Sequence, residues 1–186
     1  MENMLYEQIK DNIFRYRKYD DEAVINPVRM AGDHGVRSTY ADFSRDPKLK
    51  DLWGYYKIKV DGKKPPEHII GFRKGLDHKW LHFILAHELG HYFLEQKKQS
   101  PTTETSIVDR FYKDKRQDLT ADEKETEEAC DLFARELCMP KQKFMAGVNY
   151  YRRRGEPEGR IISLLSDDFN VPPGQVKKQG VDLGVF

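Results

Sequence analysis

Residues 77–96 constrain the fold more than any other part of the chain. Their sequence, DHKWLHFILAHELGHYFLEQ, reads as a single helix. Apolar side chains fall on nearly every side of this helix instead of along one stripe. A helix that is apolar all round is a buried, central one, so the sequence predicts that the remaining elements pack around it.

The rest of the chain predicts an α+β fold with a small, mostly antiparallel sheet. Helices are expected at residues 1–24 and 123–139, and Thr120 with Glu123 forms a capping-box pattern before the second. Strands are expected at 53–60 and 68–72, which the turn Asp61-Gly62 would join as an antiparallel pair.

Two stretches carry little regular pattern. Residues 31–52 read as mostly loop, and residues 97–122 read as a polar connection with one candidate strand at 105–112. With 186 residues, the chain is expected to form one domain or one domain with a small appendage. We expect a main domain at 1–150 and a helical tail at 151–186, which could be helix-turn-helix-like and packs on the same domain.

Composition and charge exclude several classes of protein. The formal net charge is +1, so no strong field would draw the chain to nucleic acid or to a membrane surface. We expect no transmembrane span and no signal peptide. Cys130 and Cys138 would lie about 12 Å apart on one helix, beyond disulfide reach, which favours the reducing cytoplasm. The basic run Arg152–Arg154 is read as a solvated surface, with DNA binding as the less favoured alternative.

The central helix carries the most informative motif, His87-Glu88-Leu89-Gly90-His91. Two histidines at i and i+4 project from one helix face, and both imidazoles can reach one zinc ion at about 2 Å. Glu88 lies beside that face and is the candidate general base. On a buried helix, two histidines and a glutamate would be costly without a metal. The sequence therefore predicts one Zn²⁺ per chain.

A third ligand is expected on the helix at 123–139. The longer metzincin motif is excluded because Leu94 and Lys97 replace its required glycine and histidine. On a helical wheel, Glu127 and Asp131 lie within or beside the apolar face, whereas Glu125, Glu128 and Glu136 lie far outside it. Glu127 is the predicted ligand, and Asp131, one turn later, is predicted to hold a ligand histidine by its other nitrogen.

Other residues near these motifs receive more ordinary interpretations. His82 lies well off the ligand face and is expected to be structural, and Cys130 is expected to be a small buried side chain. The strand containing Ile69, Ile70 and Gly71 is predicted to be an edge strand that binds an extended peptide substrate by strand addition.

These motifs together resemble the ImmA/IrrE family of zinc metallopeptidases. The resemblance rests on HELGHYF at 87–93 followed by EEACDLFARELCMP at 127–140, with weaker matches at Ile25-Asn-Pro-Val, Trp53-Gly-Tyr-Tyr and Ile69-Ile70. Cys130-Asp131 stands where the family usually has an Ala-Asn pair. The resemblance implies a gluzincin-like core and cleavage of a helix-turn-helix repressor that controls a mobile element, a prophage or a stress regulon.

Two alternatives to repressor cleavage stay open. The chain could be a regulatory module in which zinc is structural and the tail binds DNA or a repressor without cutting it. It could also be a peptidase that acts on another partner, such as an antitoxin. The sequence leaves the substrate and the oligomeric state undetermined.

Overall fold

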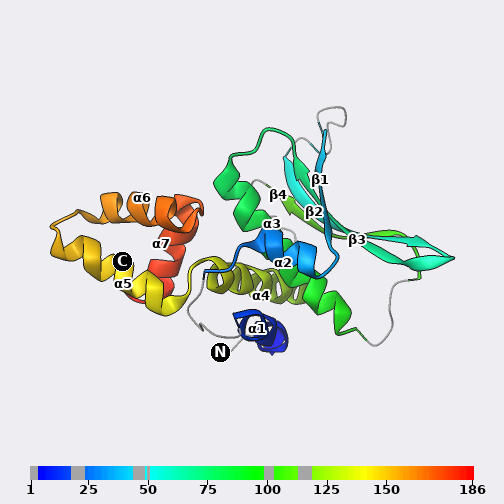
Figure 1. Ribbon diagram of the computed structural model, residues 1–186, viewed down its shortest axis with the longest axis horizontal. Coiled ribbons are helices and arrows are strands. Elements are labelled where there is room, and N and C mark those ends of the chain that lie inside the picture. Colours follow the sequence, from blue (N-terminus) through cyan, green and yellow to red (C-terminus); the bar gives the residue numbers. More distant parts are fainter. Residues whose placement is uncertain (1–3, 18–23, 44–48, 50, 99–102, 113–118) are drawn as a thin grey trace.

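A computed structural model describes residues 4–17, 24–43, 49, 51–98, 103–112 and 119–186, and it shows the predicted α+β fold (Figure 1). In chain order the elements are α1 (Met4–Arg17), α2 (Pro27–Asp33), β1 (Arg37–Ala41), β2 (Leu52–Asp61), β3 (Lys64–Arg73), α3 (His78–Gln96), β4 (Ser106–Tyr112), α4 (Ala121–Cys138), α5 (Lys141–Arg153), α6 (Glu158–Phe169) and α7 (Pro173–Asp182).

The sheet contains four strands in the order β1-β3-β2-β4. The predicted hairpin is β2–β3, which is antiparallel and turns after Asp61. The candidate strand at 105–112 is β4, which pairs antiparallel with β2. Strand β1 pairs parallel with β3, so the sheet is mixed but mostly antiparallel, as predicted.

The interpretation of residues 31–52 as mostly loop is wrong for the described part of this range, which leaves out residues 44–48 and 50. This stretch contains the end of α2 and all of β1, whose side chains are mostly exposed. A short, polar strand without apolar alternation shows no local signal, and it exists here because its backbone pairs with β3.

The discovery of β1 also overturns the expectation that residues 68–72 form an edge strand. Ile69, Ile70 and Gly71 pair with β1 on one side and with β2 on the other. Ile69 and Ile70 are buried, and the ring of Tyr55 fills the space beside Gly71. These residues therefore offer no free edge to a peptide, and the two outer strands of the sheet are β1 and β4.

Helix α3 is the buried centre of the fold, as its sequence predicts. The side chain of Asp77 caps its first turn by accepting a hydrogen bond from the Lys79 amide at 2.8 Å. Every residue from Phe83 to Phe93 is buried. Helix α3 packs against the sheet, α2 and α4, while α1 contacts both α3 and α4 (Figure 1).

Helix α4 begins at the predicted capping box, where Thr120 and Glu123 satisfy each other's backbone N–H groups. Its apolar face contains Ala129, Cys130, Phe133, Ala134 and Leu137, all fully buried. For the helix predicted at 1–24, the structure shows α1 at Met4–Arg17, and residues 1–3 and 18–23 lie outside the described part of the chain.

Gly90 sets how closely α4 approaches α3. A Cβ atom at Gly90 would lie 3.0 Å from both the Cα and the Sγ atoms of Cys130. The missing side chain therefore allows the two helices to touch beside the histidines of the HELGH motif, and Glu127 and Asp131 lie on the same helix as Cys130.

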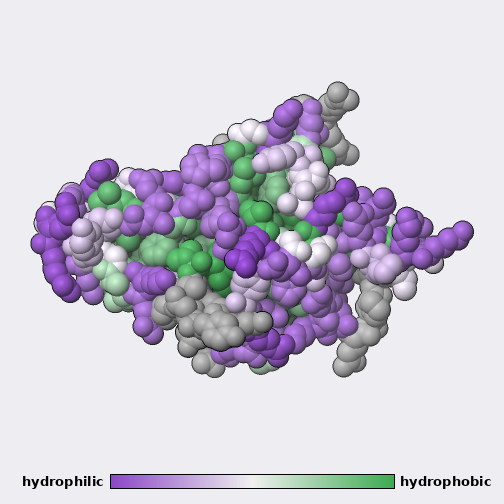
Figure 2. All heavy atoms as spheres, in the orientation of Figure 1, coloured by the Kyte–Doolittle hydropathy of each residue, from purple (hydrophilic) through white to green (hydrophobic). Residues whose placement is uncertain are grey.

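Helices α5, α6 and α7 follow as a helical C-terminal part (Figure 1). Asn170, in the left-handed region at φ 54°, ends α6 before the short link to α7. Helix α7 is joined to α4 by two ion pairs, Arg135–Asp182 at 3.0 Å and Lys178–Asp131 at 3.1 Å. Hydrophilic residues dominate the face of the molecule seen in Figure 2. Within the described residues, every helix is too short or too polar to cross a membrane.

We predict that Gly90→Ala destabilises the fold by about 1 kcal/mol, because the added methyl group meets the backbone of Cys130 and forces α3 and α4 apart. Gly159→Ala is the matched control, since a Cβ atom there meets nothing within 4 Å. This control should gain up to about 1 kcal/mol from helix propensity alone. Urea unfolding of both variants measures the difference, and equal stabilisation by both would contradict the close-contact argument.

Candidate metal centre

His87 and His91 point from the same face of α3, as their i, i+4 spacing requires. Their Nε2 atoms lie 3.2 Å apart, and the side chains are 1% and 5% exposed. Both rings are therefore held in the core, and their Nε2 atoms face the same point in space, where one metal ion could contact both.

Glu127 on α4 faces this point from the opposite side. Its Oε2 atom lies 3.4 Å from His87 Nε2, and its Oε1 atom lies 3.4 Å from His91 Nε2. Two ligands at about 2.0–2.1 Å from a tetrahedral zinc ion are separated by about 3.3–3.4 Å. The two Nε2 atoms have nearly this spacing, and each has a different Glu127 oxygen at 3.4 Å, so the three side chains converge closely enough to bind one zinc ion.

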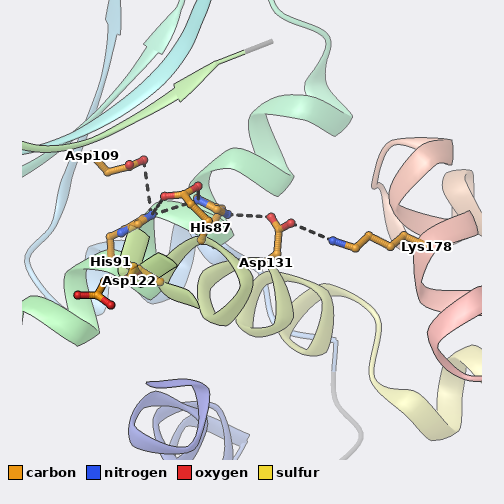
Figure 3. Close-up of polar contacts among 8 residues, drawn as sticks. His87, His91, Asp109, Asp122, Asp131 and Lys178 are labelled. Carbon is orange, nitrogen blue, oxygen red and sulfur yellow. Dashed lines mark hydrogen bonds and ion pairs between the residues drawn. The ribbon is translucent and has the colours of Figure 1, made fainter. Parts of the chain in front are cut away.

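Asp109 on β4 adds a fourth donor that the sequence analysis missed. Its Oδ2 atom lies 3.5 Å from His91 Nε2, and one donor atom from each of His87, His91, Asp109 and Glu127 falls within 4.8 Å of the others (Figure 3). The candidate strand at 105–112 was visible in the sequence, but the pairing that turns Asp109 toward α3 is not local.

Asp131 lies on the far side of His87 from the donor cluster. Its Oδ1 atom is 3.1 Å from His87 Nδ1, and because a carboxylate only accepts, the ring nitrogen donates. Its Oδ2 atom accepts a hydrogen bond from Lys178 Nζ on α7 at 3.1 Å (Figure 3). The proton on Nδ1 leaves the Nε2 lone pair facing the cluster, which is the arrangement of a metal-ligating histidine.

Glu88 is fully buried beside the cluster, and neither of its carboxylate oxygens has a hydrogen-bond partner among the described residues. Burial raises the pKa of this carboxyl well above its usual value, the charge of Asp109 raises it further, and the two histidines oppose the shift. A buried carboxylate without a partner is rare in folded proteins. Its position therefore indicates a group that must interact with something the chain itself does not supply.

The electrostatics of the cluster favour positive charge at its centre. Burial lowers the pKa of His87, but the hydrogen bonds to Asp131 and Glu127 outweigh burial and raise it well above its usual value. The pKa of Glu127 is lowered because its contacts with both histidines outweigh burial. These shifts all favour positive charge beside the carboxylates, and a cation bound in this site would supply that charge.

Among the remaining residues singled out from the sequence, Cys130 lies within hydrogen-bond reach of His91, and the others lie away from the cluster. Glu125 and Glu128 are exposed on α4, as the wheel predicts. His82 lies with its Nδ1 atom 3.9 Å from Cys138 Sγ, and burial lowers its pKa. Cys130 is buried against Gly90. A cavity of about 500 Å³ adjoins the donors and is lined by residues that include His91, Asp109 and Glu127.

One comparison with known proteins is informative. A family model described as the IrrE N-terminal-like domain, peptidase M78, matches residues 31–179. This match spans α3, β4 and α4, which together carry the four donors. No curated protein matches the chain.

We predict that Glu127→Ala abolishes tight zinc binding, whereas Asp131→Ala weakens it by about 10–100-fold, the usual cost of removing a residue that orients a ligand. Glu125→Ala and Glu128→Ala are the matched controls on the same helix and should bind zinc as the wild type does. A zinc competition titration compares all four variants. Loss of zinc in Glu128→Ala with retention in Glu127→Ala would show that the assigned ligand is wrong.

We also predict that Lys178→Met weakens zinc binding by less than tenfold, because Lys178 is partly exposed and acts only through Asp131. Asp182→Asn is the control, since it breaks the other ion pair between α4 and α7 without touching Asp131 or a histidine. Lys178→Arg should restore the affinity. Equal losses of zinc affinity in Lys178→Met and Asp182→Asn would show that α7 affects the site only by stabilising the fold.

Proposed function

The chain belongs to the IrrE N-terminal-like domain family, and we propose that it is a zinc-dependent endopeptidase that cleaves a specific protein partner. One observation carries this proposal. Two imidazoles from α3 and one carboxylate from α4 converge with contacts of 3.2–3.4 Å, and they lie next to a buried glutamate without a hydrogen-bond partner among the described residues. This combination is the donor set and the general base that metal-assisted peptide hydrolysis requires.

His87, His91 and Glu127 would hold the zinc ion. Two imidazoles and a carboxylate are a common protein set at catalytic zinc, and here both histidines are buried while Glu127 is half-buried between α4 and the histidines. Zinc in such a site supplies Lewis acidity, which polarises a peptide carbonyl and makes water a nucleophile near neutral pH.

Glu88 would carry the proton during hydrolysis. It follows His87 directly in the sequence, and its carboxyl group interacts electrostatically with both histidines. Its free carboxylate oxygens can accept a proton from the attacking water and pass it to the nitrogen of the leaving amine. Asp131 would keep the His87 ring in one orientation through Nδ1, so that Nε2 remains a ligand during the cycle.

The substrate we favour is a helix-turn-helix repressor of a mobile element, a prophage or a stress regulon. This part of the proposal is supported by the family resemblance. The cavity beside the donors has room for part of a polypeptide, and it borders α1, α3, β4 and α4. Both cysteines are buried free thiols, consistent with action in a reducing cytoplasm.

Asp109 favours a second candidate function. Structural zinc sites use four protein ligands, whereas catalytic sites keep one position open. With His87, His91 and Glu127, Asp109 makes a four-donor set. A permanently closed site of this kind would suit a regulatory module that binds DNA or a repressor without cutting it.

We predict that Glu88→Gln binds one zinc ion per chain, as the wild type does, but loses at least about 100-fold in cleavage rate. The reason is that glutamine keeps the size of the side chain and removes its capacity to take a proton. The substrates for this test are the products of the genes beside the one for this chain, each co-expressed with wild type or variant.

Glu128→Gln serves as the control, because Glu128 is exposed and lies outside the donor cluster. Metal analysis of each purified protein verifies the zinc content. Unchanged cleavage by Glu88→Gln would exclude the mechanism. Cleavage by neither wild type nor variant, with full zinc content, would favour the regulatory module.

A further inference from the structure

Strand β4 lies across the candidate metal centre. Asp109 and Phe111, two residues apart on one face of this strand, reach both histidines of α3. Asp109 Oδ2 is 3.5 Å from His91 Nε2, and the ring of Phe111 packs edge-on against His87 with the centroids 5.0 Å apart. One strand therefore covers the two histidines from the side of the sheet.

The sheet shows what β4 replaces. An extended peptide binds to a sheet by adding a strand to an edge, with its backbone hydrogen-bonded to the edge strand. Among the described strands, β2 is hydrogen-bonded to β4 along one edge and to β3 along the other. Without β4, β2 would be the edge strand nearest the metal centre, and an added peptide would pass over the same donors.

We propose that β4 is an internal occupant of the substrate position on β2, and that Asp109 is a fourth zinc ligand that keeps the centre closed until β4 is displaced. This inference rests on the proposed function. It adds that the substrate pairs with β2 and that the peptidase is inactive while β4 occupies that position.

The register of β4 supports a directed role for Asp109. Asp109 is paired with Tyr56, and the next pair is Ile107 with Lys57, so the register shifts between these positions. A bulge of this kind changes the direction of a side chain and is frequent beside active sites. The irregularity lies directly next to Asp109, where it can turn the carboxylate toward His91.

The carboxylate of Asp109 is also largely buried beside His91. Its side chain is only 14% exposed, and its buried Oδ2 atom accepts no hydrogen bond from the described residues. It faces His91 at the length of an ion pair. Three carboxylates and two histidines around one point are a stable set when a divalent cation lies between them.

Displacement of β4 would open the centre without unfolding the core. Among the described residues β4 pairs with β2 alone, and Ile107 and Arg110 on it are exposed. A partner strand added to β2 would replace the backbone hydrogen bonds that β4 gives up. Such an exchange would couple opening of the metal centre to arrival of the correct polypeptide.

The first experiment measures the zinc site on the full chain without needing a substrate. Asp109→Ala and Asp109→Asn are compared with the wild type and with Asp122→Ala, an exposed carboxylate that borders the same cavity but lies outside the donor cluster. Zinc affinity is measured by competition, and binding of acetohydroxamate, a small metal-chelating probe, is measured on the zinc-loaded proteins.

We expect both Asp109 variants to bind zinc at least about 10-fold more weakly, since loss of a direct ligand should cost no less than loss of an orienting residue. Acetohydroxamate should bind both at least about 10-fold more tightly, as expected if the wild-type site is open less than about a tenth of the time. Asp122→Ala should match the wild type in both assays. Unchanged zinc and acetohydroxamate affinities in the Asp109 variants would overturn the proposal.

The second experiment pins β4 to β2. Lys57 and Ile107 are cross-strand partners, so the double variant Lys57→Cys/Ile107→Cys can form a disulfide, and both natural cysteines are buried. Oxidation should weaken acetohydroxamate binding, and reduction with a phosphine should restore it. In the Asp109→Ala background, oxidation should have no effect, because the ligand that pinning holds in place is absent. Equal acetohydroxamate binding by the oxidised and reduced proteins with Asp109 intact would refute displacement of β4.

These results separate the two levels of the argument. Wild-type protein that binds no zinc would end the proposed function. Wild-type protein that binds zinc and cleaves its partner, with Asp109 variants unchanged in zinc and acetohydroxamate affinity, would end only this inference.

Discussion

The contact between α3 and α4 at Gly90 is the constraint on which the site depends. Cys130 lies where a side chain at position 90 would otherwise project, so the two helices touch at one turn of each. That contact places Glu127 between the Nε2 atoms of His87 and His91, and Asp131 against the opposite nitrogen of His87. Two further elements pack against this helix pair: the sheet contacts α3, and α1 contacts both α3 and α4. A donor cluster fixed in this way needs little reorganisation when a metal binds.

Charge balance gives the second constraint. A core helix that carries two histidines and a glutamate, facing two acidic side chains from α4, is costly unless opposite charges meet. In the described structure, Asp131 forms ion pairs with Lys178 and His87. Glu127 forms ion pairs with both His87 and His91. Glu88 and the Oδ2 atom of Asp109 are the members without a hydrogen bond. The carboxyl oxygens of the cluster that lack a hydrogen bond therefore gather at one point, where a bound cation would give them a partner.

Sequence alone predicted the helix pair and the order of its functional residues because helical periodicity is a local property. The spacing of His87 and His91, and the wheel positions of Glu127 and Asp131, follow from 3.6 residues per turn whatever surrounds them. Strand pairing has no such local signature. The polar segment of β1 and the direction of Asp109 depend on partners distant in sequence, so the first was interpreted as loop and the second was overlooked. The same non-local pairing made Ile69, Ile70 and Gly71 interior when they were expected at an edge.

Strand β4 connects the two functions that the metal centre permits. If Asp109 never leaves, the centre has four protein ligands and resembles a structural zinc site. If β4 can be exchanged for another strand, the same four donors become the resting state of a peptidase. A buried Glu88 with two oxygens free of partners has no use in a purely structural site, and keeping it there costs stability. The cost is understandable if Glu88 awaits water and substrate, so the burial of this residue weighs in favour of a centre that opens.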